Sequence, residues 1–375
     1  MPINAGPEFE LAMEKYSAAR TTKEKIQALQ EAIKYMPKHK GAENLRAQLF
    51  RRLAELKREL QREKERRSGG GGIRIIPKEG FQTVLFGFPN SGKTYILSKL
   101  TNAPVKPTEY PLATTEPTPG MMVADGGKVQ LVEVPSYFEG YGESKMGRIG
   151  LATIRSTDAV ALVVDLTQDP IKQVRTLVEF LRDEDIFLNK KPPNVRVERK
   201  YSGGYQFIGE SFMEGDRRLY QDILQTYGIH NAVITFLERT TPKEFMLAIN
   251  ESARFLPAIL IGTKVEQAPE KYISSFNSIP NVNKVLFRND DLNGTKRAIF
   301  RALGLIRVYT KPPRGKPSSE PIVLRAGSTV ADIADRIFPN KEIKQARVWG
   351  STRFPGQTVG LDYVLHDGDV VELRV

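Results

Sequence analysis

The sequence predicts an α/β fold in which a mostly parallel β-sheet carries helices on both faces. From Phe81 onward, short apolar segments suited to buried strands alternate with helix-forming stretches, which is typical of parallel sheets. The four segments are residues 83–86, 129–134, 159–164 and 258–261. A chain of 375 residues is also long enough for two or three domains, so we expect further modules around this sheet.

The composition excludes several classes of function. With no cysteine, the chain has no disulfides, cysteine-based zinc sites or thiol nucleophiles. The three histidines, His39, His230 and His366, are too scattered to suggest a metal cluster. Apolar runs such as 159–164 are far shorter than the roughly 20 residues of a membrane span, and the N-terminus has no signal-peptide core. We therefore expect a cytoplasmic protein with no membrane partner.

The positive charge is concentrated near the N-terminus. The formal net charge of the chain is +12. Residues 38–67 contain eleven Lys or Arg and five Glu, so this segment supplies half of the net positive charge. Clustered basic side chains gain free energy by releasing counterions from phosphates, which favours a polyanionic partner. A solvated helix face balanced by its own glutamates explains the same run, and the sequence leaves both interpretations open.

The first part of the chain is expected to be a basic helical hairpin, resembling a helix-turn-helix region, over residues 1–68. Residues 8–36 form helix around four apolar anchors, Leu11, Ile26, Leu29 and Ile33. The following stretch repeats leucine at helical spacing, a pattern that indicates the packing seam of the hairpin. These leucines are Leu45, Leu49, Leu53, Leu56 and Leu60. Ser68 and four glycines then form a flexible joint and a domain boundary.

The central domain is expected over residues 73–310 and to contain an insertion. Nearly a hundred residues separate its third and fourth strands, more than one crossover helix requires. Within this length the pattern predicts a small α+β subdomain at about 187–242. It has two extended runs around a Ser-Gly-Gly turn, a helix at 217–227 and a strand at 232–237.

A Pro-rich basic linker leads to a last module, expected over residues 320–375. Strands are predicted at 321–325, 347–349 and 370–373, with a helix that starts at the capping box of Thr329. Together they predict a compact half-sheet with one packed helix.

The strongest chemical signal is a glycine-rich sequence that follows the first strand and opens a helix at Tyr95. It consists of Gly87, Phe88, Pro89, Asn90, Ser91, Gly92, Lys93 and Thr94. The spacing fits a phosphate loop, whose backbone N–H groups surround a polyphosphate at a helix N-terminus. In such a loop Lys93 reaches the β- and γ-phosphates and the Thr94 hydroxyl binds Mg²⁺.

With these residues in place, the chain resembles the Obg-related GTPases, and among them the developmentally regulated GTP-binding proteins. The similarity extends through the polyglycine, the phosphate loop and six further segments. These are YPLATTEPTPG at 110–120, FEG at 138–140, LNKKPPN at 188–194, YGIHN at 227–231, IRVYTKP at 306–312 and VWG at 348–350. The resemblance implies a P-loop GTPase domain with an N-terminal helical hairpin, an inserted S5-like subdomain and a C-terminal β-grasp module, the TGS domain.

The resemblance also implies a function and several residue roles. It implies a switch that binds GTP and GDP, hydrolyses GTP slowly with Mg²⁺, and associates with ribosomes or RNA, often with a stabilising partner protein. Lys93 and Thr114 would be catalytic; Thr114 would bind Mg²⁺ and sense the γ-phosphate, with Thr115 as the alternative. Asn90 lies where potassium-dependent relatives hold K⁺, although an asparagine in a turn is an equal explanation. Tyr137 follows Ser136 where other GTPases place a glutamine, which implies slow hydrolysis.

Two motifs depart from the family pattern. The Asp-x-Pro-Gly motif appears as Glu133, Val134, Pro135 and Ser136, and the base-reading Asn-Lys-x-Asp appears as Thr263, Lys264, Val265 and Glu266. Lys264 is still expected to cover the base. The longer Glu266 side chain predicts weaker guanine discrimination, since a hydrogen bond to a charged group contributes about 1.5–3 kcal/mol. These changes leave two alternatives open: a ribosome- or RNA-binding scaffold with a degenerate nucleotide site, or an ATPase of the same fold.

The predicted nucleotide site thus combines the phosphate loop with residues from both motifs and the helix start. Its members are Gly87, Phe88, Pro89, Asn90, Ser91, Gly92, Lys93, Thr94, Tyr95, Glu133, Pro135, Ser136, Thr263, Lys264 and Glu266.

Overall fold

The computed structural model describes residues 6–19, 21–36, 43–68, 76–105, 115–124, 126–339, 343 and 345–374. Its contacts divide the chain into two compact units. Unit 1 joins Met1–Gly72 to Lys191–Ala253, and unit 2 joins Ile73–Lys190 to Arg254–Val375. Among the described helices, none combines the length and apolar composition that crossing a membrane requires.

The core of unit 2 is a six-stranded sheet with the strand order β11-β10-β4-β1-β3-β2. Its strands are β1 (Phe81–Gly87), β2 (Thr118–Ala124), β3 (Gly127–Glu133), β4 (Ala159–Asp165), β10 (Ala258–Thr263) and β11 (Asn283–Leu286). The pairings are parallel except that of β2 with β3, which is antiparallel. The predicted mostly parallel sheet is therefore confirmed, with the antiparallel edge strand β2 added to it.

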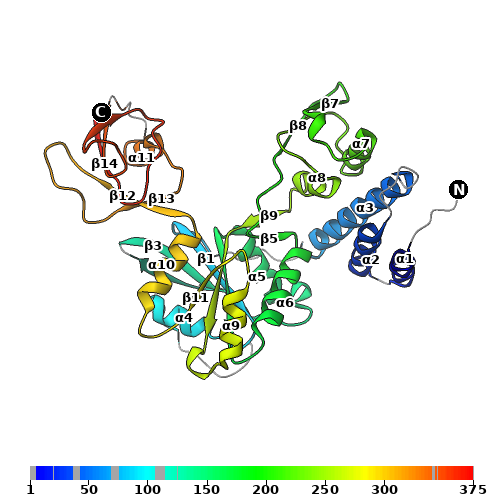
Figure 1. Cartoon of the computed structure of the whole chain (residues 1–375), viewed down its shortest axis with the longest axis horizontal. Helices are drawn as coiled ribbons and strands as arrows, with labels where there is room; N and C mark the ends of the chain where they lie inside the picture. The colour runs from blue at the N-terminus through cyan, green and yellow to red at the C-terminus, as the bar shows by residue number, and fades with distance from the viewer. Residues whose placement is uncertain are drawn as a thin grey trace. The chain divides into compact units, whose positions relative to one another are not determined.

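Helices cover both faces of this sheet, as the sequence predicts (Figure 1). One face packs on α4 (Lys93–Leu100) and α10 (Leu292–Ala302), and the other on α5 (Lys145–Ser156), α6 (Pro170–Asp183) and α9 (Glu270–Ser278). Successive residues of β1 point to opposite faces: Leu85 belongs to the first cluster, and Val84 and Phe86 to the second. Strand β1, which leads into the glycine-rich sequence, is therefore held in place by apolar contacts on both of its faces.

The N-terminal helices and the insertion share one hydrophobic core in unit 1. The helices are α1 (Pro7–Ala18), α2 (Thr22–Tyr35) and α3 (Glu43–Ser68). Of the leucine stripe, Leu49, Leu53 and Leu56 are buried, and Leu45 and Leu60 pack against the cluster. The stripe is thus a packing seam, as predicted, but it packs against residues of the insertion as well as against the other helices.

Two details of the N-terminal helices differ from the sequence prediction. The helix expected over 8–36 is interrupted, and α2 starts at a capping box in which Thr21 and Glu24 each accept a hydrogen bond from the other's backbone N–H. Leu11, taken as an anchor, is 55% exposed, whereas Phe9 and Ala12 of α1 are buried. The buried face of a short helix is set by the elements that pack against it. The prediction that Leu11 is buried rested on its apolar side chain alone and was wrong.

Part of the basic run on α3 is paired within unit 1. Arg51 makes an ion pair of 2.7 Å with Asp222 of the insertion. Arg52 pairs with Glu55 at 2.9 Å and donates a hydrogen bond to the Tyr16 hydroxyl, and these two hydrogen bonds raise the pKa of Arg52. These two cations therefore contribute to the packing of unit 1.

The insertion contains a three-stranded sheet with the order β6-β8-β7, backed by α7 (Arg217–Thr226) and α8 (Pro242–Ile249). The two runs around the Ser-Gly-Gly turn, β6 (Val195–Arg199) and β7 (Tyr205–Ile208), do not pair with each other. Strand β8 (Ala232–Phe236) lies between them, antiparallel to β6 and parallel to β7. A short 3₁₀ turn, η3 (Glu210–Phe212), follows β7, and β5 (Ile186–Leu188) pairs with β9 (Arg254–Leu256) where unit 2 borders the insertion in sequence.

The C-terminal module is a five-stranded sheet, β13-β12-β16-β14-β15, with one helix. Its elements are β12 (Leu305–Thr310), β13 (Ile322–Arg325), α11 (Val330–Ile337), β14 (Gln345–Trp349), β15 (Gln357–Val359) and β16 (Val370–Arg374). The Thr329 capping box is present. The module starts before residue 320, the start expected from the sequence. Strand β12, which precedes the Pro-rich linker, pairs with both β13 and β16 and so belongs to the same sheet.

Candidate functional site

The glycine-rich loop, residues 87–93, connects β1 to α4 at the carboxyl ends of the parallel strands, where open α/β sheets bind ligands. Gly87 lies so close to β4 that a Cβ there would meet the Val163 carbonyl oxygen at 2.4 Å. Asn90 and Gly92 both have left-handed backbone conformations, with φ of 58° and 89°. These positions let the loop turn tightly and start α4 at Lys93.

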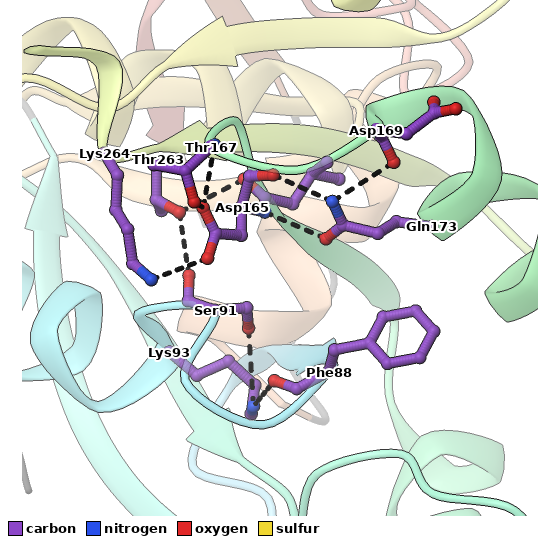
Figure 2. A network of polar contacts seen from close by, with 10 residues as sticks. Phe88, Ser91, Lys93, Asp165, Thr167, Asp169, Gln173, Thr263 and Lys264 are labelled. Atoms are coloured by element: carbon purple, nitrogen blue, oxygen red, sulfur yellow. Dashed lines mark hydrogen bonds and ion pairs between the residues drawn. The ribbon is translucent and has the colours of Figure 1, made fainter. Parts of the chain in front are cut away.

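Lys93 is buried inside this loop, with 3% of its surface exposed. Its ammonium donates hydrogen bonds of 2.8 Å to the Phe88 carbonyl and of 2.8 Å to the Ser136 hydroxyl. Longer contacts join it to the Gly87 carbonyl at 3.4 Å and the Ser91 hydroxyl at 3.5 Å. Figure 2 shows the contacts with Phe88 and Ser91. Burial lowers the pKa of Lys93 to about 8, against the opposing attraction of Glu133.

Beside the lysine, Thr94 and Glu133 bring two oxygen groups together. The Thr94 hydroxyl donates a hydrogen bond of 2.7 Å to Oε1 of Glu133. Glu133 is the last residue of β3, is 2% exposed, and lies opposite Leu85 in the parallel register. A hydroxyl and a buried carboxylate are the hard oxygen donors that Mg²⁺ prefers, so this pair fits a magnesium ion.

The segment after β3 stays close to the glycine-rich loop. The Tyr137 N–H donates a hydrogen bond of 2.9 Å to the Gly87 carbonyl, and the buried Tyr141 hydroxyl donates one of 3.0 Å to the Pro135 carbonyl. The Tyr137 ring meets that of Phe88 edge-on, with 5.2 Å between centroids, and that of Phe180 at 5.0 Å. Residues 134–141 are therefore joined to the loop by one backbone hydrogen bond and one aromatic contact, both made by Tyr137, and the Tyr141 hydroxyl braces the segment internally.

On the other side of the loop, Thr263 and Lys264 follow the end of β10. The Thr263 hydroxyl donates to the Ser91 carbonyl at 2.8 Å and lies 3.1 Å from the Val164 carbonyl. The Lys264 ammonium lies 2.6 Å from Oδ2 of Asp165, a carboxylate at the end of β4 (Figure 2). The tip of β10 thus contacts both the loop and the neighbouring strand.

Asp165 is a site residue that the sequence motifs missed. Its Oδ1 accepts hydrogen bonds from the N–H and the hydroxyl of Thr167, at 2.9 and 2.7 Å. Gln173 of α6 bonds to the Asp165 backbone through both ends of its amide, accepting at 3.1 Å and donating at 2.8 Å (Figure 2). A carboxylate directly after a buried parallel strand was the signal available in the sequence.

The remaining predicted residues are less closely gathered. Glu266 is exposed in a single 3₁₀ turn, η4 (Val265–Gln267), after Lys264. Asn90 is exposed, Pro89 is half-buried, and the Tyr95 hydroxyl donates to Oδ1 of Asn289 at 2.8 Å. Thr114 lies outside the described residues, and its alternative Thr115 is exposed. The structure thus assembles the loop with Glu133, Pro135, Ser136, Thr263 and Lys264.

The sheet order, the loop between β1 and α4 and the adjoining lysine and oxygen groups define a P-loop GTPase domain, followed by a module of TGS type. A family model described as "50S ribosome-binding GTPase" matches residues 82–199, and a model of the TGS domain matches residues 306–375. These matches confirm the predicted fold class.

Similarity over nearly the whole chain identifies the family. An uncharacterized GTP-binding protein of Methanocaldococcus jannaschii is 30% identical over 94% of this chain and 92% of its own. Developmentally-regulated G-protein 1 of Arabidopsis thaliana is 30% identical over 93% and 90%, and developmentally-regulated GTP-binding protein 1 of Xenopus laevis is 32% identical over 86% and 90%. The chain belongs to the family of developmentally regulated GTP-binding proteins, which confirms the resemblance drawn from its motifs.

Proposed function

We propose that the chain binds GTP and GDP, hydrolyses GTP slowly with Mg²⁺, and acts as a switch associated with the ribosome. One observation carries this proposal: the buried ammonium of Lys93 and the Thr94–Glu133 oxygen pair lie side by side at the start of α4. A cation for phosphate oxygens and a donor set for Mg²⁺ are the two elements that phosphoryl transfer requires. Family membership supports the same conclusion.

The residues of the loop and of the magnesium pair have separate roles in this proposal. The loop from Gly87 to Thr94 wraps the phosphates, and Lys93 balances charge on the β- and γ-phosphates. Thr94 and Thr114 would hold Mg²⁺, with Glu133 beside them, and the bound ion would neutralise charge on the phosphate oxygens. Titration of the protein with a GTP analogue before and after chelation of Mg²⁺ tests this assignment through the loss of affinity.

Slow hydrolysis follows from the surroundings of Tyr137. Its ring packs against Phe88 and Phe180, so this position offers no carboxamide to orient an attacking water. Catalysis is then left to cations and backbone donors. We propose that K⁺ near Asn90 adds one such cation. Because Asn90 is left-handed, Asn90→Gly keeps the backbone and removes the amide, and it should abolish any difference in turnover between KCl and NaCl.

Base selection is assigned to Lys264 and Glu266. The stem of Lys264 would cover the base, and Glu266 would accept the two guanine N–H donors with a longer reach than the family aspartate. Glu266→Asp should therefore raise guanine affinity about tenfold, while adenine affinity stays unchanged. In wild type, this assignment predicts tighter binding of a GTP analogue than of an ATP analogue. An ATPase of the same fold predicts tighter binding of the ATP analogue.

Calorimetric titration with GDP and with non-hydrolysable GTP and ATP analogues tests nucleotide binding directly. Lys93→Met should abolish binding of the GTP analogue, and Lys99→Met, an exposed lysine on the same helix α4, should leave it unchanged. Absence of micromolar binding to any guanine nucleotide in wild type would refute the proposal. The scaffold alternative predicts no phosphate release that depends on Lys93.

Ribosome association rests on the positive charge and on the family model's description. Arg51 and Arg52 have partners inside unit 1, so their reversal would also break packing. Arg196 and Arg218 of the insertion are exposed and offer a cleaner test. Their joint reversal to Glu should weaken co-sedimentation with ribosomes and flatten its salt dependence. Lys128→Glu, at an exposed position on β3, is the matched control. Binding to isolated RNA alone would instead indicate an RNA partner.

A cytoplasmic location and a stabilising partner protein complete the proposal. Cell fractionation tests the first. Purification of the tagged full chain tests the second, because a stabilising partner should co-purify in a fixed ratio and slow degradation of the chain.

A further inference from the structure

Among the hydrogen-bond acceptors described for the Lys93 ammonium, Ser136 is the one that comes from outside the glycine-rich loop. Gly87, Phe88 and Ser91 belong to the loop, whereas Ser136 follows β3. The Lys93–Ser136 hydrogen bond is 2.8 Å long, equal to the bond with the Phe88 carbonyl. Ser136 is 6% exposed, so this bond is shielded from water.

The neighbours of Ser136 hold its backbone in this position. On its N-terminal side, the Pro135 carbonyl accepts the Tyr141 hydroxyl, and on its C-terminal side, the Tyr137 N–H donates to Gly87. Anchors on both sides leave the Ser136 backbone little freedom, so the contact with Lys93 is built into the fold around it.

Lys93 has three protons to donate and four acceptors within 3.5 Å, two of them close. A buried ammonium depends on such acceptors, because burial without them is costly. A phosphate oxygen that binds Lys93 must therefore replace one of these groups as the acceptor of a Lys93 hydrogen bond. The loop acceptors are part of the loop itself, whereas the Ser136 hydroxyl belongs to a side chain that can release its bond by rotating to another rotamer while its backbone stays in place.

We propose that Ser136 determines the selectivity between nucleoside diphosphate and triphosphate, an inference that rests on the proposed function. Its hydroxyl competes with an oxygen of the terminal phosphate of a triphosphate for a proton of Lys93. A diphosphate accepts one hydrogen bond from Lys93 through its β-phosphate, which replaces the longer contacts with Gly87 and Ser91 and leaves the Lys93–Ser136 bond in place. A triphosphate accepts a second hydrogen bond through its γ-phosphate and breaks the Lys93–Ser136 bond, so the serine shifts the balance toward the diphosphate.

The test compares affinities for GDP and a non-hydrolysable GTP analogue in wild type, Ser136→Ala and Ser136→Gly by calorimetric titration with Mg²⁺. Ser136→Ala removes one oxygen, and it should raise the ratio of triphosphate to diphosphate affinity about tenfold, as expected for a hydrogen bond to a charged group. Ser136→Gly also removes the Cβ and should raise the ratio at least as far. Ser136→Thr keeps the hydroxyl and should stay near the wild-type ratio.

Ser274→Ala, an exposed serine on α9, is the matched control and should leave both affinities unchanged. If the substitutions only loosened the loop, affinity for both nucleotides would fall equally and the ratio would not change. An unchanged ratio in both Ser136→Ala and Ser136→Gly would therefore overturn the inference while leaving the proposed function intact. Wild type that binds no guanine nucleotide would overturn both.

Discussion

The Thr263 hydroxyl donates a hydrogen bond of 2.8 Å to the Ser91 carbonyl, joining two residues that are 172 positions apart in the chain. Thr263 occupies the first position of the motif expected to read the base, yet its described contacts are with the glycine-rich loop and with Val164 of β4. We infer that Thr263 is a positioning residue that acts on the site through the loop it holds.

The first prediction concerns this hydrogen bond. Thr263→Val keeps the shape and removes the donor, so a buried carbonyl loses its partner at a cost of about 1–3 kcal/mol in the free energy of unfolding. Nucleotide affinity should fall in parallel, because the loop is less firmly held. Thr263→Ser should behave like wild type in both denaturant unfolding and titration. Equal stability of wild type and Thr263→Val would show that the bond contributes nothing.

The second prediction concerns Asp165, whose carboxylate accepts from Thr167 and pairs with Lys264. Asp165→Asn removes the charge that makes these hydrogen bonds strong. The free energy of unfolding should fall by about 1.5–3 kcal/mol, since hydrogen bonds to charged groups have this magnitude. Asp290→Asn, at an exposed position, serves as the control in the same denaturant titration. Similar midpoints for both variants would contradict the role assigned to Asp165.

The third prediction tests the shared core of unit 1. Leu53 is 3% exposed in a cluster that also contains Leu219 and Ile223 of α7. Leu53→Ala should cost about 2–5 kcal/mol, and the loss should reduce hydrogen-exchange protection in α7 as well as in α3. Leu11→Ala, at a site 55% exposed, should change protection by less than about 0.5 kcal/mol. Full protection of α7 in Leu53→Ala would mean that the two segments unfold independently.

The fourth prediction is a pH dependence in the C-terminal module. The Arg307 side chain binds Asp367 at 3.0 and 2.7 Å and, through its hydrogen bond, lowers the pKa of that carboxyl below its usual 3.8. A lowered folded pKa stabilises the module above the unfolded pKa, and this contribution disappears as pH falls through the folded pKa. Asp367→Asn should therefore lower the melting temperature at neutral pH.

The difference between Asp367→Asn and wild type should shrink as pH falls and vanish below the folded pKa of Asp367, where the carboxyl is protonated and neither Asp nor Asn carries a charge. Thermal unfolding followed by circular dichroism across this range measures it. A difference that persists unchanged at low pH would assign the effect to shape and not to charge.

Much of the fold was predictable because its signals are local. Apolar runs such as 159–164 indicated buried parallel strands, and the capping box at Thr329 marked the start of α11. The glycine-rich loop was predictable for the same reason, since Gly87 and Gly92 meet backbone demands that few other residues satisfy. These features depend on neighbouring residues in the chain, so a single sequence contains them.

Features that depend on distant partners were missed or misplaced. Apolarity alone made Leu11 an anchor, although the covered face of α1 holds Phe9 and Ala12. The strand β8 separates β6 from β7 although these two adjoin one turn, because pairing depends on which edges meet in space. Asp165 escaped notice because its importance comes from Lys264, which is 99 positions away in the chain.

The sequence by itself determined the alternation of strands and helices and the loop that starts α4, since both follow from residue type and spacing. Its motifs also carried the resemblance to the family. Only the tertiary structure decided what these residues touch. It joined the leucine stripe of α3 to the insertion, bonded Thr263 to Ser91, and brought the Ser136 hydroxyl to Lys93. Hydrogen bonds and apolar contacts act over a few ångströms, and folding alone brings residues from distant parts of a chain within that range.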